Sequence, residues 1–128
     1  MAQIRVGAFP PLEGPSPAPA SQASFVVKAA DAGLDHVCIG DHVSLFVGAG
    51  FDGLVNAAAL AVAHSAIPVH VGVYLLPLRH PTLVARQIAD LEVLAPGRLV
   101  LGVGIGGEDR HEYEACGVDP RTSGRRMD

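Results

Sequence analysis

Four short apolar runs recur along the chain, and their starts are about thirty residues apart, the length of one strand–helix unit. The runs are apolar on both faces, as in parallel strands that are covered on both sides of a sheet. The pattern predicts buried parallel strands at Ile4–Ala8, His36–Ile39, Val69–Leu75 and Arg98–Val103.

Three segments between these runs carry helix signals. The first is expected to begin at Ser21, which can cap a helix, and to end at Gly33, which readily adopts the left-handed conformation. The second is expected to begin near Asp52 and to continue through an alanine-rich stretch to about His64. The third begins at Pro81, where the missing N–H of proline costs nothing. Its apolar residues recur at helical spacing, at Val84, Ile88, Leu91 and Ala95.

Repeated strand–helix units fold either as a doubly wound sheet or as a (β/α)8 barrel of the TIM type. The loops after the strands (residues 9–20, 41–52 and 104 onward) are longer than the loops before them. Long loops after strands favour a barrel, because barrels build their sites there, and a complete barrel takes about 250 residues. We therefore predict an α/β chain of one domain, residues 1–128, that is the N-terminal half of a (β/α)8 barrel. Its four β/α units would end at the start of a fourth helix.

Composition and charge narrow the class of protein. The chain is 49% hydrophobic and 17% charged, with a net charge of −4. It lacks the basic patch that a nucleic-acid-binding protein presents. The longest apolar run, Ala57–Ala63, is much shorter than the roughly 20 residues of a membrane span, and no secretory signal is visible. With isolated cysteines at positions 38 and 116, we expect a cytoplasmic protein without nucleic-acid or membrane partners.

The histidines do not show the spacing of a metal site. His36, His64, His70 and His111 are scattered, and the HExxH pattern is missing from the sequence. Cys38 lies inside an apolar run, where a buried thiol is the simpler interpretation. No metal site is predicted.

The fourth apolar run leads directly into a cluster of glycines. Gly102, Gly104 and Gly107 match the G-x-G-x-x-G pattern that binds a pyrophosphate in dinucleotide-binding folds, so a Rossmann-type nucleotide-binding enzyme is one alternative. The position of the pattern weakens this alternative, because it follows the fourth strand and not the first. The charged residues from Glu108 onward would also repel a pyrophosphate. An open sheet with the strand order 3-2-1-4 would support it.

Five motifs occur in an order that resembles a known family. They are residues 40–42 (GDH), 76–81 (LPLRHP), 95–98 (APGR), 101–107 (LGVGIGG) and 124–128 (GRRMD). The chain resembles the bacterial luciferase-like flavin-dependent oxidoreductases, particularly the branch that uses an 8-hydroxy-5-deazaflavin coenzyme. The resemblance spans essentially the whole chain. It implies a (β/α)8 barrel, usually dimeric, with the flavin ring at the C-terminal mouth.

The resemblance implies a catalytic pair at Asp41 and His42. Histidine exchanges protons near neutral pH, and hydride transfer needs such a partner when the substrate gains or loses a hydroxyl proton. The carboxylate of Asp41 would orient the imidazole of His42. The simpler alternative is that Asp41 caps a turn and His42 only lines a loop.

The resemblance also implies two segments that contact the cofactor ring. The expected cofactor-binding residues are Val73, Tyr74, Leu76, Ile105, Gly106, Gly107 and Glu108. In the third strand, the family carries a non-prolyl cis peptide, which the alignment places at the Val73–Tyr74 bond. In the glycine run, backbone N–H and C=O groups would reach the polar edge of the ring, with Glu108 as a candidate acid. The alternatives are an ordinary core strand and a tight turn.

The implied function is an oxidoreductase that acts on a small organic substrate, which the sequence does not identify. We favour hydride transfer with the deazaflavin coenzyme because of the Asp41–His42 pair; monooxygenation with FMN is the variant. The loops at 9–20 and 43–52 would contact the substrate, and the full-length protein would be a homodimer. The chain alone is expected to be inactive, since the family's phosphate-tail contacts come from later strands. A non-enzymatic half-barrel assembly module is a further alternative, because four barrel strands leave both sheet edges unpaired.

Overall fold

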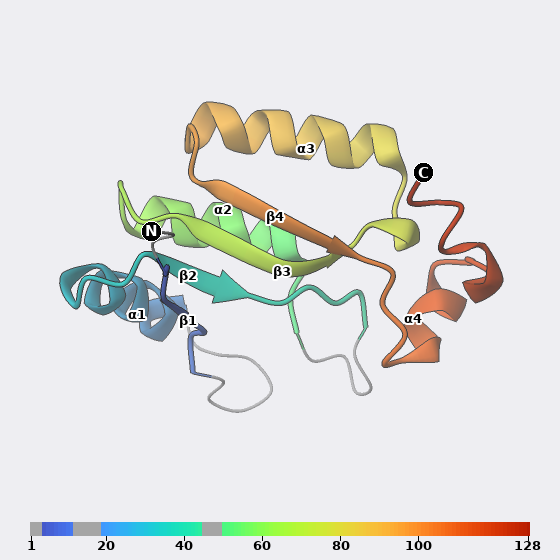
Figure 1. Cartoon of the computed structure of the whole chain (residues 1–128), viewed down its shortest axis with the longest axis horizontal. Coiled ribbons are helices and arrows are strands. Elements are labelled where there is room, and N and C mark those ends of the chain that lie inside the picture. The colour runs from blue at the N-terminus through green and yellow to red at the C-terminus, as the bar shows by residue number, and fades with distance from the viewer. Residues whose placement is uncertain (1–3, 12–18, 45–49) are drawn as a thin grey trace.

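The computed structural model describes residues 4–11, 19–44 and 50–128. Parts of the two long loops expected to contact substrate, residues 12–18 and 45–49, therefore lie outside the described residues. Strands and helices alternate along the chain (Figure 1). They are β1 (Gly7–Ala8), α1 (Pro19–Asp31), β2 (His36–Ile39), α2 (Gly53–Ala63), β3 (Val69–Leu75), η1 (Leu76–Leu78), α3 (Pro81–Leu94), β4 (Leu99–Gly104), α4 (Arg110–Ala115) and η2 (Pro120–Thr122).

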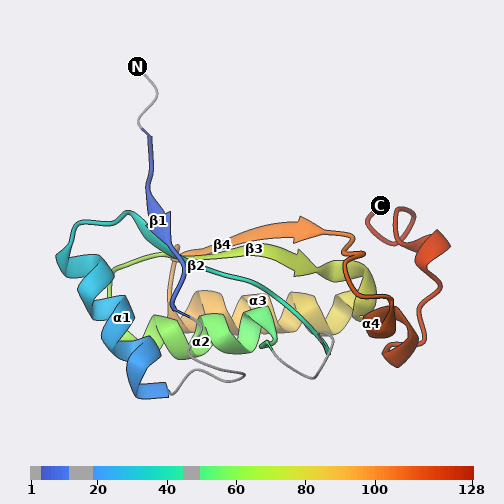
Figure 2. The ribbon, with the colours of Figure 1, turned by 90° about the horizontal axis from the view of Figure 1, so that it is seen from below.

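The four strands form one parallel sheet in the order β1-β2-β3-β4. Each strand pairs with the one that precedes it, and α1, α2 and α3 all cover the same face of the sheet (Figure 2). A doubly wound sheet would place helices on both faces. The Rossmann-type alternative is therefore wrong, and the sheet has the arrangement of successive β/α units in a (β/α)8 barrel.

The hydrophobic core lies between the sheet and the helices. Val37 and Val71 from the strands are fully buried there, against Val26 of α1 and Leu60 of α2. The stripe predicted for α3 is confirmed: Val84, Leu91 and the following Ala95 are buried, and Ile88 packs against the core. On the opposite face of the sheet, apolar side chains are partly exposed, such as Val73 by 45% and Val100 by 46%.

The predicted helix starts are close to those observed. Asp52 caps α2, because its carboxylate accepts hydrogen bonds from the N–H groups of Leu54 and Val55, both at 3.0 Å. Pro81 is the first residue of α3, as expected. Helix α1 begins at Pro19, two residues before the expected Ser21.

The segment from residue 104 onward was expected to be a long loop, but part of it is helical. It forms the short helix α4, which Asp109 caps by accepting a hydrogen bond from the N–H of His111 at 3.0 Å. The helix expected to open within residues 124–128 is not formed, and residues 123–126 are turns after η2. Among the described residues, none of the helices has the length and apolar character needed to cross a membrane.

Candidate functional site

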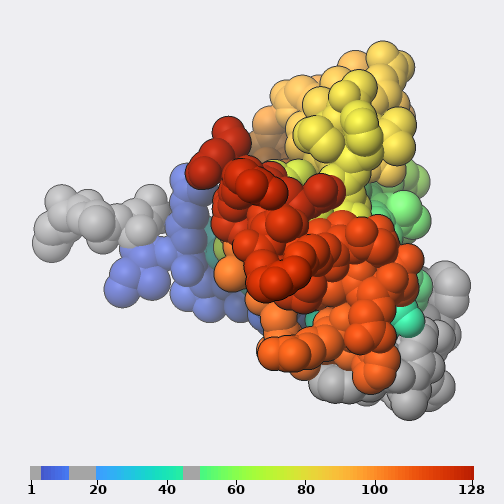
Figure 3. Space-filling view, turned by 90° about the vertical axis from the view of Figure 1, so that its right-hand side faces the viewer, coloured from blue at the N-terminus to red at the C-terminus, as the bar shows by residue number. Residues whose placement is uncertain are grey.

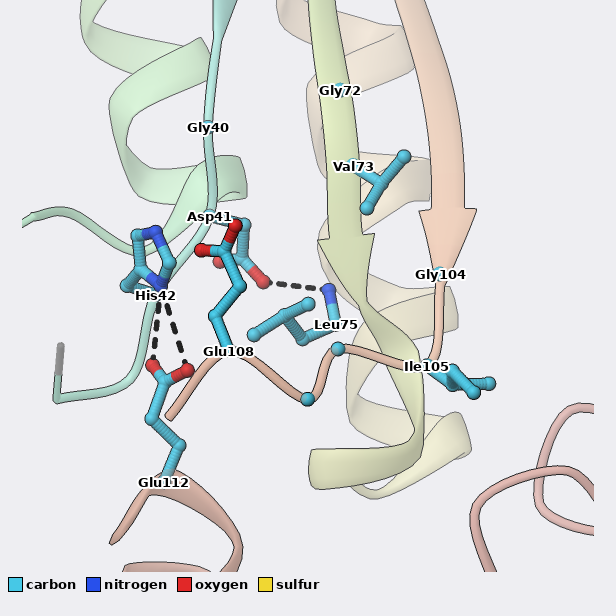
Figure 4. A pocket seen from close by; sticks show the side chains of 12 residues that line it. Gly40, Asp41, His42, Gly72, Val73, Leu75, Gly104, Ile105, Glu108 and Glu112 are labelled. Carbon is cyan, nitrogen blue, oxygen red and sulfur yellow. Dashed lines mark hydrogen bonds and ion pairs between the residues drawn. The ribbon is translucent and has the colours of Figure 1, made fainter. Parts of the chain in front are cut away.

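A cavity of about 340 Å³ lies at the carboxyl ends of β2, β3 and β4 (Figure 4). Its lining residues come from four segments that are distant in the sequence. They are Gly40, Asp41 and His42 after β2; Gly72, Val73 and Leu75 in β3; Gly104, Ile105, Gly106, Gly107 and Glu108 after β4; and Glu112 in α4. We call this cavity the rim pocket. Figure 3 shows this end of the molecule, over which α4 and the residues that follow it spread.

His42 is held on two sides at the rim pocket. Its backbone N–H donates to the carbonyl oxygen of Phe51 at 3.0 Å. Gly50, with a φ of 95°, packs so closely that a Cβ there would lie 3.1 Å from the Cβ of His42. On the other side, Nδ1 of His42 lies 3.4 Å from Oε1 of Glu112 (Figure 4). The side chain remains 24% exposed, so the ring is fixed and still accessible.

Glu112 is a site residue that sequence reasoning missed. Its carboxylate accepts hydrogen bonds from the N–H groups of Val43 at 2.6 Å and Ser44 at 3.1 Å, and its side chain is 3% exposed. These hydrogen bonds connect the segment after β2 to α4. A sequence signal was available: Asp109 and Glu112 have the D-x-x-E spacing of a helix start.

Asp41 does not contact His42 in the way the sequence suggested. Its carboxylate accepts hydrogen bonds from the N–H groups of Gly53 and Leu75, both at 2.7 Å. Two further bonds come from the guanidinium of Arg79, at 2.8 and 2.7 Å. Burial raises the pKa of Asp41, while the Leu75 and Gly53 donors and Arg79 act in the opposite direction. Asp41 therefore connects β2, β3 and α2 beneath the rim, and the carboxylate that lies beside His42 is that of Glu112.

Arg79 lies between two carboxylates. Beyond Asp41, it donates to Oδ2 of Asp52 from Nη2 at 3.0 Å and from Nε at 3.3 Å. Its guanidinium carbon is also 4.3 Å from the centroid of the Tyr74 ring, a cation–π contact. Asp52 is the cap of α2, so this one arginine connects the start of α2 with the ends of β2 and β3.

The cis peptide expected in β3 is present one bond earlier than predicted, between Gly72 and Val73. The pairing of β3 with β4 shifts register between Val71 and Tyr74, so the irregular segment is centred before Tyr74. Val73 lines the rim pocket, as expected. Tyr74 does not: it points into the core and is fully buried, and its hydroxyl has no hydrogen-bond partner among the described residues.

Leu76 was expected to contact the cofactor, but it does not line the rim pocket. It begins η1 and packs against the core, whereas its neighbour Leu75 lines the rim pocket. The register shift in β3 explains the difference, because it reverses which residues of the strand face the pocket.

The glycine run reaches the rim pocket as expected. Ile105, Gly106, Gly107 and Glu108 all line it. Gly106 and Gly107 have φ values of 74° and 128°, which other residues rarely adopt, and a Cβ at Gly107 would meet no atom within 4 Å. The backbone here is therefore open to a ligand. The hydroxyl of Tyr113 in α4 donates to the carbonyl oxygen of Ile105 and so connects the loop to α4.

Two of the histidines judged to be scattered are neighbours in the fold. His36 and His70 lie on adjacent strands, with ring centroids 5.5 Å apart, and Cys38 lies beside them. Sequence spacing does not reveal this proximity, because the two parallel strands pair residues that are more than thirty positions apart.

One protein family matches this chain over its whole length, and a curated relative matches most of it. The family model described as luciferase-like monooxygenase matches residues 1–128. A curated F420-dependent glucose-6-phosphate dehydrogenase from Kineococcus radiotolerans is 37% identical over 93 residues, which is 70% of this chain and 28% of that protein.

Solved structures share the fold. The oxygenating constituent of 3,6-diketocamphane monooxygenase from Pseudomonas putida, in complex with FMN, has a TM-score of 0.79 at 22% identity, covering 96% of this chain and 38% of that one. The coenzyme F420-dependent tetrahydromethanopterin reductase from Methanopyrus kandleri has a TM-score of 0.71 at 23% identity, covering 98% and 38%. The chain thus spans less than half the length of each of these proteins.

Proposed function

The chain belongs to the luciferase-like monooxygenase family, and on that premise we propose that the rim pocket binds the ring of a deazaflavin coenzyme or of FMN. The proposed reaction is hydride transfer to or from a small organic substrate beside His42. One observation carries the proposal: His42 and the glycine run, which are about sixty residues apart, line the same cavity. We also propose, from the resemblance, that the full-length protein is a homodimer and, from its isolated cysteines, that it is cytoplasmic.

The residues of the rim pocket fit a flat ring. The cavity of about 340 Å³ is at the lower end of the range for small-molecule sites. Glycines at positions 72, 104, 106 and 107 leave the backbone without side chains, so its N–H and C=O groups can approach the polar edge of a ring. Val73, Leu75 and Ile105 supply apolar surface for its faces. When bound, a flavin or deazaflavin supplies a carbon or nitrogen that accepts or donates hydride.

The chain's own contribution to the reaction is proton transfer and positioning. Because Nδ1 of His42 faces the carboxylate of Glu112 at 3.4 Å, that nitrogen holds a proton and Nε2 is left to exchange a proton with the substrate. Glu112 fixes the orientation of the ring. The same carboxylate also accepts hydrogen bonds from the N–H groups of Val43 and Ser44, which restrains the loop that carries His42.

Of the two cofactors, we favour the deazaflavin coenzyme. A histidine held for proton exchange suits a reaction that interconverts an alcohol and a carbonyl group by hydride transfer. The F420-dependent relative from Kineococcus radiotolerans supports this choice. The likeness to a monooxygenase that binds FMN supports the second candidate, oxygenation with reduced FMN.

Binding of the isolated rings tests the proposal without depending on a phosphate tail. We expect 8-hydroxy-5-deazariboflavin to bind the chain more tightly than riboflavin, as followed by the fluorescence anisotropy of the ring. Ile105→Trp narrows the rim pocket and should weaken binding at least tenfold. Val93→Trp, on the exposed face of α3, should leave binding unchanged. Tighter binding of riboflavin would favour FMN. Binding of neither ring, or equal binding by Ile105→Trp, would contradict the proposal and favour the half-barrel assembly module.

A further inference from the structure

Three potential metal ligands gather on the face of the sheet opposite the helices. They are His36 and Cys38 of β2 and His70 of β3, and one ligand atom from each lies within 4.8 Å of the other two. All three side chains are half-buried. None of the three residues lines the rim pocket.

The parallel register places these side chains together. Residues two apart on a strand point to the same face, so His36 and Cys38 share one side of β2. Cys38 pairs with His70 across to β3, which brings the second imidazole to the same spot. The two imidazole rings meet edge to face, with an interplanar angle of 63°.

Glycines on the neighbouring strands leave room around the imidazoles. Gly7 of β1 pairs with His36, and a Cβ at position 7 would overlap the imidazole of His36. Near His70, a Cβ at Gly102 or Gly72 would lie 3.6 or 3.7 Å from Nε2. Gly7 thus makes space for the ring of His36 itself, and the small residues at positions 72 and 102 leave Nε2 of His70 open to an approaching ion.

We propose that His36, Cys38 and His70 form a binding site for a zinc-class transition-metal ion. Two imidazole nitrogens and one thiolate sulfur form a donor set that Zn²⁺ prefers. In a tetrahedral zinc site these donors lie roughly 3.3 to 3.6 Å apart. Side-chain rotations that bring the three atoms closer by about an ångström therefore complete the geometry. The fourth position is left to water.

Binding of the ion replaces one proton. Burial raises the pKa of the Cys38 thiol, so without a metal the sulfur carries its hydrogen. When the sulfur–metal bond forms, the S–H proton passes to solvent, and the two imidazoles bind through neutral nitrogens. No electron is transferred in this step.

The site lies deeper in the sheet than the rim pocket. Gly40 and Gly72 line the pocket and follow Cys38 and His70 by two residues on the same strand faces. Two residues of strand amount to about 7 Å. A bound ion would therefore connect β2 to β3 below the pocket floor and stabilise the part of the sheet that carries the rim. This inference goes beyond the proposed function and does not depend on it.

Cobalt binding to the chain tests the proposal, because Co²⁺ occupies zinc sites and absorbs light strongly when a thiolate ligates it. We expect one Co²⁺ per chain, a thiolate-to-cobalt charge-transfer band, and loss of that band when Zn²⁺ is added in equal amount. Cys38→Ser should abolish the band and His70→Gln should weaken Co²⁺ binding at least tenfold. The matched controls Cys116→Ser and His80→Gln should behave like the unsubstituted chain.

The opposite results overturn the proposal. They are the absence of a charge-transfer band in the folded chain, or an unchanged band in Cys38→Ser. Circular dichroism checks the fold of each variant. If His70→Gln fails to fold, Cys38→Ser still tests the proposal, because it replaces only the sulfur atom with oxygen. Zn²⁺ should also raise the melting temperature of the unsubstituted chain and not that of Cys38→Ser, as binding to the folded state requires.

Discussion

Nδ1 of His42 lies 3.4 Å from Oε1 of Glu112, although the two residues are seventy positions apart in the chain. The same carboxylate binds the N–H groups of Val43 and Ser44. Helix α4 therefore positions the histidine that the proposed function depends on. This relationship leads to the first prediction.

Glu112→Gln should disturb the protonation pattern of His42 while leaving the fold intact. The amide oxygen, kept at the Oε1 position by the N–H groups of Val43 and Ser44, is then uncharged, and the NH₂ group takes the Oε2 position 3.5 Å from Nδ1, where it cannot accept a proton. Nitrogen NMR should show the ring of His42 moving from the Nδ1–H tautomer towards the Nε2–H tautomer. Glu114→Gln, on the exposed side of α4, serves as the control. An unchanged tautomer in Glu112→Gln would show that Glu112 does not position His42.

Arg79→Met should destabilise the protein strongly. The substitution leaves the carboxylate of Asp41, which is fully buried, without its charged partner, and breaking a buried pair in this way costs about 3–5 kcal/mol. Chemical denaturation measures the loss. Arg86→Met removes an exposed pair with Asp90 and should change the free energy of unfolding by less than about 0.5 kcal/mol. Equal effects of the two substitutions would contradict the structural role of Arg79.

Tyr74→Phe should stabilise the protein. The hydroxyl of Tyr74 is buried without a hydrogen-bond partner among the described residues. Its removal abolishes a desolvation cost of about 1 kcal/mol or more, while the ring still packs under Arg79. The free energy of unfolding should rise accordingly. A loss of stability would mean that the hydroxyl has a partner.

Alkaline pH should weaken the fold through the same side chain. Burial raises the pKa of Tyr74 to about 12 from its ordinary value of 10. The folded state therefore holds the phenolic proton more tightly than the unfolded state does. Stability is fully retained below pH 10 and decreases as the pH rises from 10 to about 12. The decrease should be smaller in Tyr74→Phe, as measured by denaturation at each pH, and an equal decrease would contradict the assignment.

Gly53→Ala should destabilise the protein by about 1–3 kcal/mol through overpacking. A Cβ at Gly53 would lie 2.8 Å from Cγ1 of Val71 and 3.0 Å from Cβ of Asp41. This close approach lets the start of α2 reach the carboxylate of Asp41. Gly124→Ala is the matched control, because a Cβ there would meet no atom within 4 Å. A melting temperature of Gly53→Ala equal to that of the control would contradict the packing described here.

The local pattern of the sequence predicted most of the fold. Apolar runs identified β2, β3 and β4, and Asp52 and Pro81 marked the starts of α2 and α3. The Gly102–Gly107 run indicated a loop that is open to a ligand, and its residues from Gly104 onward line the rim pocket. These features depend on residues close together in the chain, which is why periodicity and capping reveal them.

Long-range contacts were not predictable in the same way. Asp41 precedes His42, and adjacency suggested contact; yet neighbours in an extended backbone point to opposite sides. Asp41 accordingly reaches Arg79, and Glu112 reaches His42. Likewise the register shift in β3 buried Tyr74 and replaced Leu76 with its neighbour at the rim pocket. Such pairings arise from strand register and helix docking, which no local spacing encodes.

The most direct test of the central claim is an amide NMR titration of the chain with 8-hydroxy-5-deazariboflavin. The account predicts that the signals of Gly104, Gly106 and Gly107 shift together with the ring signals of His42, while Gly33 and Gly117, which do not line the rim pocket, stay unchanged. Shifts confined to residues outside the rim pocket, or shifts of the glycine run without any change at His42, would contradict it.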